Sequence, residues 1–134
     1  MSDCSIWIVD DDPDDLELIE QAFNDCRQGV RVFESEDAEK IFPTLESLSP
    51  AELPQLILLD INMPVMSGKA LLEKIKGDDR FKYLPVIMFT TSNSAKEMTE
   101  CYDKGANCFI TKPHTYTQMV DICSSLVVLF CRNN

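Results

Sequence analysis

The stretch Leu56-Ile57-Leu58-Leu59-Asp60-Ile61-Asn62-Met63-Pro64 decides the fold of this chain. Four consecutive apolar residues run directly into a carboxylate, and a polar turn with a proline follows. A short apolar run between such breakers predicts a strand that is buried on both faces. In open parallel sheets, ligands bind outside the carboxyl ends of the strands. We therefore expect Asp60 to be a reactive carboxylate at the mouth of a crevice.

On either side of this stretch, short β-branched runs alternate with amphipathic segments. Strands are expected at residues 5–9, 30–33, 56–59, 85–89 and 107–110. Helices are expected at 12–28, 37–48, 67–77, 94–104 and 115–131, with a break at Gln28-Gly29 and a start or kink at Pro43. Five strand–helix repeats predict a doubly wound α/β fold, in which helices cover both faces of a parallel five-stranded sheet.

Length and composition restrict the class of protein. The chain has 134 residues, of which 45% are hydrophobic, so residues 1–134 are expected to form one domain with one packed core and no output domain. Twelve basic and 23 acidic residues give a net charge of −11, which argues against a nucleic-acid partner. No signal peptide opens the chain, and no apolar run approaches the ~20 residues of a membrane span. A soluble, cytoplasmic protein without a membrane partner is expected.

The six cysteines have no spacing typical of a zinc site. None forms a C-x-x-C pair, and the single histidine, His114, is near none of them in the sequence. Most of them fall within apolar runs or on apolar helix faces. We therefore expect free, buried cysteines that act as small hydrophobic residues.

Four of the expected strands end in residues that carry chemistry. The first ends at Asp10 and Asp11, the third at Asp60, the fourth at Thr90 and the fifth at Lys112. Because parallel strands end at one edge of the sheet, these side chains are expected to converge. Each alone has an ordinary explanation as a helix cap, a turn residue or a surface residue, and His114 is expected at the surface. The functional interpretation depends on their co-occurrence.

Three neighbouring carboxylates require a cation, and Mg²⁺ prefers oxygen ligands. Beside such an ion, the carboxylate of Asp60 could attack phosphorus and form an aspartyl phosphate. The ammonium of Lys112 and the hydroxyl of Thr90 could then neutralise or bind the phosphoryl oxygens. Nothing in the set resembles a strong general base for a separate substrate.

The residues at these strand ends resemble the receiver domain of two-component response regulators. The resemblance rests on Val9-Asp10-Asp11, on Leu59-Asp60-x-Asn62-Met63-Pro64-x-Met66-x-Gly68, on Thr90-Thr91-Ser92 and on Thr111-Lys112-Pro113. Their order and spacing match over essentially the whole chain. The resemblance implies the flavodoxin-like fold with strand order 2-1-3-4-5, for which the chemotaxis receiver is a standard example.

The resemblance also implies roles for single residues. Asp60 would accept a phosphoryl group from a histidine kinase. Asp11 would bind Mg²⁺ directly, Asp10 through water, and Asn62 through its backbone carbonyl. Lys112 would contact the phosphoryl group, with a cis peptide bond to Pro113.

Further positions concern the switch that follows phosphorylation. Thr90 would move toward the phosphoryl group, and Phe109 stands where the family often carries a tyrosine, so the ring is kept and the hydroxyl is lost. Thr91 and His114 stand where the family commonly has small and apolar residues. Asn62 and Ser92 flank the position where water is placed, and both are polar, which predicts a phosphate lifetime that is not unusually long.

The chain's partners follow from the same resemblance. The acidic start and the Thr-Thr-Ser form are similar to the stand-alone receivers that accompany sensor kinases, including phytochrome-like ones. A downstream protein would bind the face made by the fourth and fifth strands and helices. In the last helix, Met119, Cys123, Leu126 and Phe130 are expected in the core, and the remaining apolar residues either pack deeply or form a homodimer surface.

Two other functions compete with a phosphorylation switch. A Mg²⁺-dependent phosphohydrolase with an aspartyl nucleophile typically has a second acid two residues later, where this chain has Asn62. A receiver-like scaffold would bind partners without phosphorylation, but the acid set, Thr90 and Lys112 argue against it. The chain is therefore expected to be a phosphoacceptor, with self-phosphorylation and autodephosphorylation chemistry only, and not an enzyme.

Overall fold

The computed structural model describes residues 4–26 and 29–131. The strands are β1 Cys4–Val9, β2 Val30–Ser35, β3 Leu56–Leu59, β4 Val86–Thr90 and β5 Cys108–Thr111. The helices are α1 Pro13–Cys26, α2 Ile41–Ser47, α3 Gly68–Lys76, α4 Ala95–Asp103 and α5 Tyr116–Phe130. Two short 3₁₀ turns, η1 Ala38–Lys40 and η2 Pro50–Glu52, flank α2.

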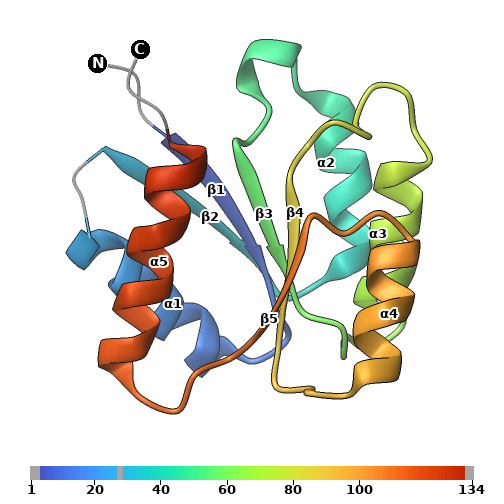
Figure 1. Cartoon of the computed structure of the whole chain (residues 1–134). Helices are drawn as coiled ribbons and strands as arrows, with labels where there is room; N and C mark the ends of the chain where they lie inside the picture. Colours follow the sequence, from blue (N-terminus) through green and yellow to red (C-terminus); the bar gives the residue numbers. More distant parts are fainter. Residues whose placement is uncertain (1–3, 27–28, 132–134) are drawn as a thin grey trace.

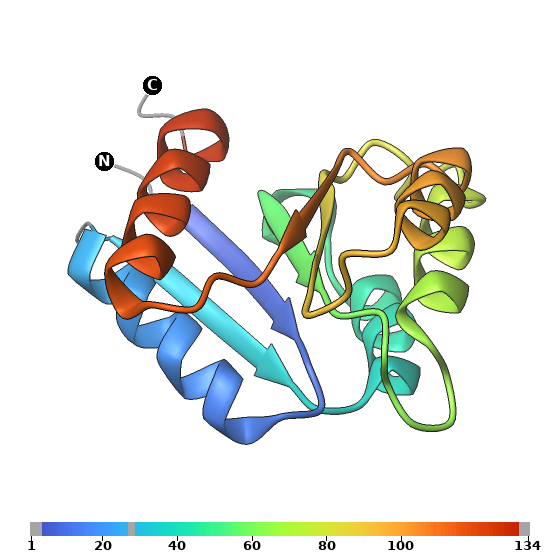
Figure 2. The ribbon, with the colours of Figure 1, turned by 60° about the horizontal axis from the view of Figure 1, so that its bottom comes forward.

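All five strands are parallel and lie in the order β2-β1-β3-β4-β5. Helices α1 and α5 cover one face of the sheet, and α2, α3 and α4 cover the other (Figure 1). The predicted doubly wound, flavodoxin-like fold is therefore confirmed. The carboxyl ends of the strands point to the lower edge of Figure 1, and Figure 2 turns this edge toward the viewer.

The sheet divides the interior into two cores because successive side chains of a strand point to opposite faces. In β3, Leu56 and Leu58 pack toward α1 and α5, whereas Ile57 and Leu59 pack toward α2, α3 and α4. All four are buried, as expected for a central parallel strand. This burial on both sides fixes the position of the residue that follows β3, which is Asp60.

Helix boundaries follow the capping signals of the sequence. Ser67, Ser94 and Thr115 each accept a hydrogen bond from a backbone N–H of the first turn, and α1 begins at Pro13. Pro43 lies in the first turn of α2, where its missing N–H costs no intrahelical bond. Helix α1 ends at Cys26. Of the predicted break at Gln28-Gly29, Gln28 lies outside the described residues, and Gly29 lies in a turn with φ 83°.

Helix α5 packs differently from the prediction in one respect. Met119, Cys123 and Leu126 are buried as expected, but Val127 completes the buried set, whereas Phe130 is only partly buried. Val128 and Leu129 are 75% and 62% exposed. The helix is therefore not packed on all its apolar sides. Within residues 4–26 and 29–131, no helix combines the length and apolar character that a bilayer span requires.

The expectation that all six cysteines are free is wrong for two of them. Cys4, which begins β1, and Cys131, which follows α5, form a disulfide with a Cα–Cα distance of 5.3 Å. They are 127 residues apart, and only the packing of α5 beside β1 brings them together. The other four cysteines, Cys26, Cys101, Cys108 and Cys123, are free as predicted.

The disulfide is expected to stabilise the fold strongly, because it closes a very long loop in the unfolded chain. Under non-reducing conditions, Cys131→Ala should lower the free energy of unfolding by about 2–5 kcal/mol. Urea unfolding with and without dithiothreitol measures this, and the reductant should destabilise the native protein but leave Cys131→Ala unchanged. Equal sensitivity of both proteins, or an intact mass that shows no loss of two hydrogens, would contradict the prediction.

Candidate functional site

The site lies at the carboxyl edge of the sheet, where β3 delivers Asp60 between the ends of its neighbours. The Asp60 N–H donates to the carbonyl of Val9 at 2.9 Å, so the backbone remains tied to β1 after β3 has ended. The Asp60 residue is only 7% exposed. The carboxylate is thus held by the two central strands and has little freedom to move.

Gly68 allows the loop after Asp60 to fold back closely. Its N–H donates to the Ile61 carbonyl at 2.9 Å, and a Cβ at this position would lie 1.9 Å from the Asp60 carbonyl oxygen. The loop between them also holds Val65 at φ 68°, a left-handed conformation that β-branched residues rarely adopt. The sequence marked Gly68 as part of a motif, and the structure shows that any side chain there would displace Asp60.

Three carboxylates meet at this edge. One oxygen each of Asp10, Asp11 and Asp60 lie within 4.8 Å of one another, and these three residues are called the acid trio below. Asp10 is 2% exposed and Asp11 is exposed. Among the described residues, the Asp60 Oδ1 is a buried oxygen with no hydrogen-bond partner. A buried acceptor without a donor costs free energy, so this oxygen fits a cation ligand.

The electrostatics of Asp10 agree with a cation site. Burial raises its pKa to about 6, and the hydrogen bonds from Lys112 and from the Asp12 N–H offset only part of that effect. The neighbouring charge of Asp60 raises the pKa further. The cluster therefore favours added positive charge, whether a proton or a metal ion supplies it.

Lys112 follows β5 and brings an ammonium into the acidic cluster. Its Nζ lies 2.5 Å from Asp10 Oδ2, 2.6 Å from Asp15 Oδ2 and 3.6 Å from Asp60 Oδ2. Burial lowers the pKa of Lys112, but the hydrogen bonds to the two nearer aspartates outweigh burial, so the net pKa is raised. Lys112 is therefore charged, as predicted, and its nearest partners are Asp10 and Asp15.

One sequence expectation around Lys112 needs correction. The peptide bond to Pro113 is trans, and the described residues contain no cis peptide bond. Trans is the favoured state of an X–Pro bond, and Lys112 reaches the carboxylates from it. The structure also adds a residue to the site: Asp15, in the first turn of α1, is a direct partner of Lys112.

The remaining predicted residues differ in their exposure. Thr90 is completely buried, and its Oγ1 accepts a hydrogen bond of 3.3 Å from the Ser92 N–H. Thr91 and Asn62 are exposed in the loops that follow β4 and β3. Phe109 is 7% exposed in β5, and its N–H donates to the hydroxyl of Tyr102 in α4. His114 is exposed, as expected.

The loop after β4 is fastened to the neighbouring helices. The Ser92 hydroxyl donates to Glu97 in α4 at 2.5 Å, and Lys69 of α3 lies 3.3 Å from the same carboxylate. The Thr111 hydroxyl donates to the Ser92 carbonyl at 3.0 Å. This network, which was not predicted, ties the loop beside Thr90 to α3, α4 and β5.

The fold and this edge define a flavodoxin-like protein with a cluster of three carboxylates and a buried lysine beside it. The model of the response regulator receiver domain matches residues 6–124. This chain belongs to the response regulator receiver domain family, whose members act in two-component systems.

Individual relatives agree with this assignment. The chain is 35% identical over 79 residues to chemotaxis protein CheY1 of Helicobacter pylori, an alignment that covers 59% of this chain and 64% of the relative. It is 29% identical over 123 residues to response regulator Rre1 of Synechocystis, an alignment that covers 92% of this chain and 51% of that relative. The chain thus spans less than two thirds of the length of these relatives.

Solved structures show the same fold. The phosphorylated cyanobacterial phytochrome response regulator RcpA superposes with a TM-score of 0.88 at 28% identity, over 97% of this chain and 95% of that one. The receiver domain of a response regulator from Rhodospirillum rubrum superposes with a TM-score of 0.81 at 26% identity, over 97% of this chain and 95% of that one. The Mn²⁺-bound form of response regulator Rcp1 superposes with a TM-score of 0.83 at 23% identity, over 98% of this chain and 96% of that one.

Substitution of Gly68 by alanine is expected to disturb the site and the fold together. The new Cβ must push the Asp60 backbone away, which should lower the free energy of unfolding by about 1–3 kcal/mol. Chemical denaturation measures this. Gly77→Ala is the control, because Gly77 has an ordinary helical conformation and its Cβ would lie 3.1 Å from the Glu73 carbonyl oxygen and 3.9 Å from that of Lys74. Equal stability losses for both variants would contradict the prediction.

Proposed function

We propose that Asp60 accepts a phosphoryl group and that phosphorylation switches a partner-binding surface of this protein. The observation that carries the proposal is the buried, unpartnered Oδ1 of Asp60, which lies among two further carboxylates and next to a buried ammonium. Receiver domains accept phosphoryl groups from histidine kinases, and this chain belongs to that family. The set at the sheet edge supports phosphoryl acceptance better than either alternative function.

Each residue of the site contributes a separate part of the chemistry. Asp10, Asp11 and Asp60 would hold Mg²⁺, with the Asn62 backbone carbonyl as a further ligand. When bound, Mg²⁺ neutralises the carboxylates and accepts an oxygen of the phosphoryl group. The Asp60 carboxylate is the nucleophile, and Lys112 neutralises a second oxygen. Thr90 would donate its hydroxyl to a third after leaving the Ser92 N–H.

The alternative functions are less well supported by the same residues. A phosphohydrolase of this type requires a proton donor two residues after the nucleophile, and Asn62 cannot serve as a carboxylic acid. A scaffold that works without phosphorylation has no use for a buried lysine between buried acids, because unneeded buried charge costs stability. The family model that matches the chain is that of a phosphoacceptor domain, and the chemistry proposed for it is limited to gaining and losing a phosphoryl group.

The proposal predicts a defined covalent product. Incubation with Mg²⁺ and acetyl phosphate should add one phosphoryl group, which intact mass spectrometry at acidic pH detects. The adduct should be lost in base and should be absent from Asp60→Asn, whereas Asp37→Asn, which removes a capping carboxylate of η1 outside the acid trio, should still form it. Absence of an adduct in the native protein would favour the scaffold, and turnover of many phosphomonoesters would favour the hydrolase. The same assay measures the phosphate lifetime, which should be shorter than many hours.

Metal affinity is expected to depend on pH through Asp10. Because the pKa of Asp10 is raised to about 6, its proton competes with the metal below that value and not above it. Mg²⁺ affinity should therefore fall by about tenfold per pH unit below pH 6 and level off above pH 7. Calorimetric titrations at pH 5, 6 and 7.5 measure this, with Asp10→Asn as the variant in which the dependence should be much weaker. An affinity that does not change between pH 5 and 7.5 would contradict the prediction.

We further propose a sensor histidine kinase as the phosphoryl donor. RcpA is a phytochrome response regulator, and the structural similarity to it supports a phytochrome-like kinase as the donor. The match over residues 6–124 supports a receiver domain, which would work in the cytoplasm beside its kinase. The Cys4–Cys131 disulfide is unusual for a reducing compartment, so in the cytoplasm it would undergo thiol–disulfide exchange with the cellular pool of thiols.

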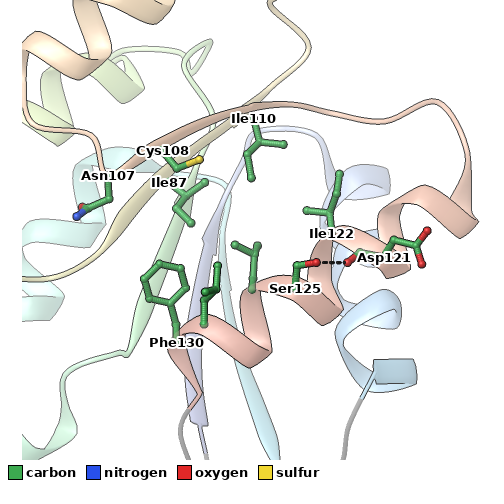
Figure 3. Close-up of a pocket in the computed structure, with 10 residues that line it drawn as sticks. Ile87, Asn107, Cys108, Ile110, Asp121, Ile122, Ser125 and Phe130 are labelled. Carbon is green, nitrogen blue, oxygen red and sulfur yellow. Dashed lines mark hydrogen bonds between the residues drawn. The ribbon is translucent and has the colours of Figure 1, made fainter.

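The proposed output surface is the face formed by β4, α4, β5 and α5. It contains an apolar groove of about 450 Å³ between β5 and α5. In Figure 3, Cys108 and Ile110 of β5 face Ile122 and Phe130 of α5 across this groove. The exposed Leu129 also lines the groove. This surface would accept a downstream protein or a second copy of the chain.

A further inference from the structure

The ammonium of Lys112 lies closer to Asp10 and Asp15 than to Asp60. Charge-assisted N–H···O bonds have donor–acceptor distances of about 2.7–2.9 Å. Nζ is within hydrogen-bond distance of Asp10 and Asp15, at 2.5 and 2.6 Å, whereas Asp60 Oδ2 is 3.6 Å away. The lysine is therefore bound to two acids, one of which, Asp15, lies outside the acid trio.

Asp15 differs from Asp10 in its surroundings. The Asp10 side chain is 2% exposed, so it could lose its lysine only if another cation replaced it. The Asp15 side chain is 29% exposed and lines a cavity of about 250 Å³ together with Lys112, Thr91 and Asn93. Water can hydrate this carboxylate when the lysine leaves. The Asp15 contact is therefore the one that can break at low cost.

We propose that Asp15 is a positioning residue that holds Lys112 back from Asp60 and so sets the affinity of the site for a phosphoryl group. The inference rests on the proposed function and adds a regulatory residue to the same site. The ammonium must exchange the Asp15 oxygen for a phosphoryl oxygen when Asp60 is modified. In addition, the negative charge of Asp15 opposes the incoming negative charge of the phosphoryl group.

The consequence is that removal of the Asp15 charge strengthens phosphoryl binding. Asp15→Asn keeps the shape of the side chain but leaves Lys112 with a weaker partner. The dissociation constant for beryllofluoride, which imitates the phosphoryl group on a carboxylate, should fall by about three- to tenfold, as expected for one partly exposed charged contact. The rate of phosphorylation by acetyl phosphate should rise in the same proportion.

The experiment compares native protein, Asp15→Asn, Asp15→Glu and Asp14→Asn by ¹⁹F NMR titration with beryllofluoride at saturating Mg²⁺. Asp14 lies in the same first turn of α1 and is exposed, so its substitution reproduces the general change of charge. We expect tighter binding only in Asp15→Asn, and Asp15→Glu should return toward the native value. Mg²⁺ affinity, measured separately, should change equally in Asp15→Asn and Asp14→Asn.

The outcomes separate this inference from the proposed function. If the native protein binds no beryllofluoride and forms no phosphoryl adduct, the proposed function fails. If the native protein binds it but Asp15→Asn equals Asp14→Asn, or binds more weakly, the role of Asp15 is overturned. Loss of a structural contact alone would not tighten ligand binding. Should Asp15→Asn prove unfolded in a thermal melt, Asp15→Ser offers the same comparison with a smaller side chain.

Discussion

The functional edge of this molecule depends on two buried aspartates that share one ammonium. Asp10 and Asp60 leave the two central strands side by side, because Asp60 donates its N–H to Val9, the last residue of β1. Lys112 supplies one positive charge to the pair, and Asp11 adds a third carboxylate. Burial raises the pKa of Asp10, and the charge of Asp60 adds to this effect, so the edge favours added positive charge.

The sheet holds these charges in place by hydrophobic packing on both faces. Residues of β3 alternate between the two cores, so β3 cannot shift by one residue without moving all its side chains to the wrong face. The close approach of Gly68 to the Asp60 backbone adds a second restraint. The Asp60 carboxylate is therefore held in a fixed position at the end of β3.

The opposite end of the molecule carries a covalent restraint. The Cys4–Cys131 disulfide joins the start of β1 to the end of α5, whereas the acid cluster lies at the other end of the same strand. Helix α5 is thus fixed at its end to the strand that carries Asp10, and it exposes Val128 and Leu129 beside the β5–α5 groove. The strand that leads to Asp10 is thus joined covalently to the helix that lines this groove.

The sequence by itself determined the five strand–helix repeats and the convergence of Asp10, Asp60, Thr90 and Lys112, because both depend on local periodicity and on the geometry of parallel strands. It also located the helix caps Ser67, Ser94 and Thr115, whose bonds are local. Only the tertiary structure decided the Cys4–Cys131 pair, the burial of Val127 in place of Phe130, the trans bond before Pro113 and the contact of Asp15 with Lys112. Apart from the bond before Pro113, each depends on side chains or elements that meet across the fold. For that proline, the trans bond is the state that X–Pro bonds ordinarily favour.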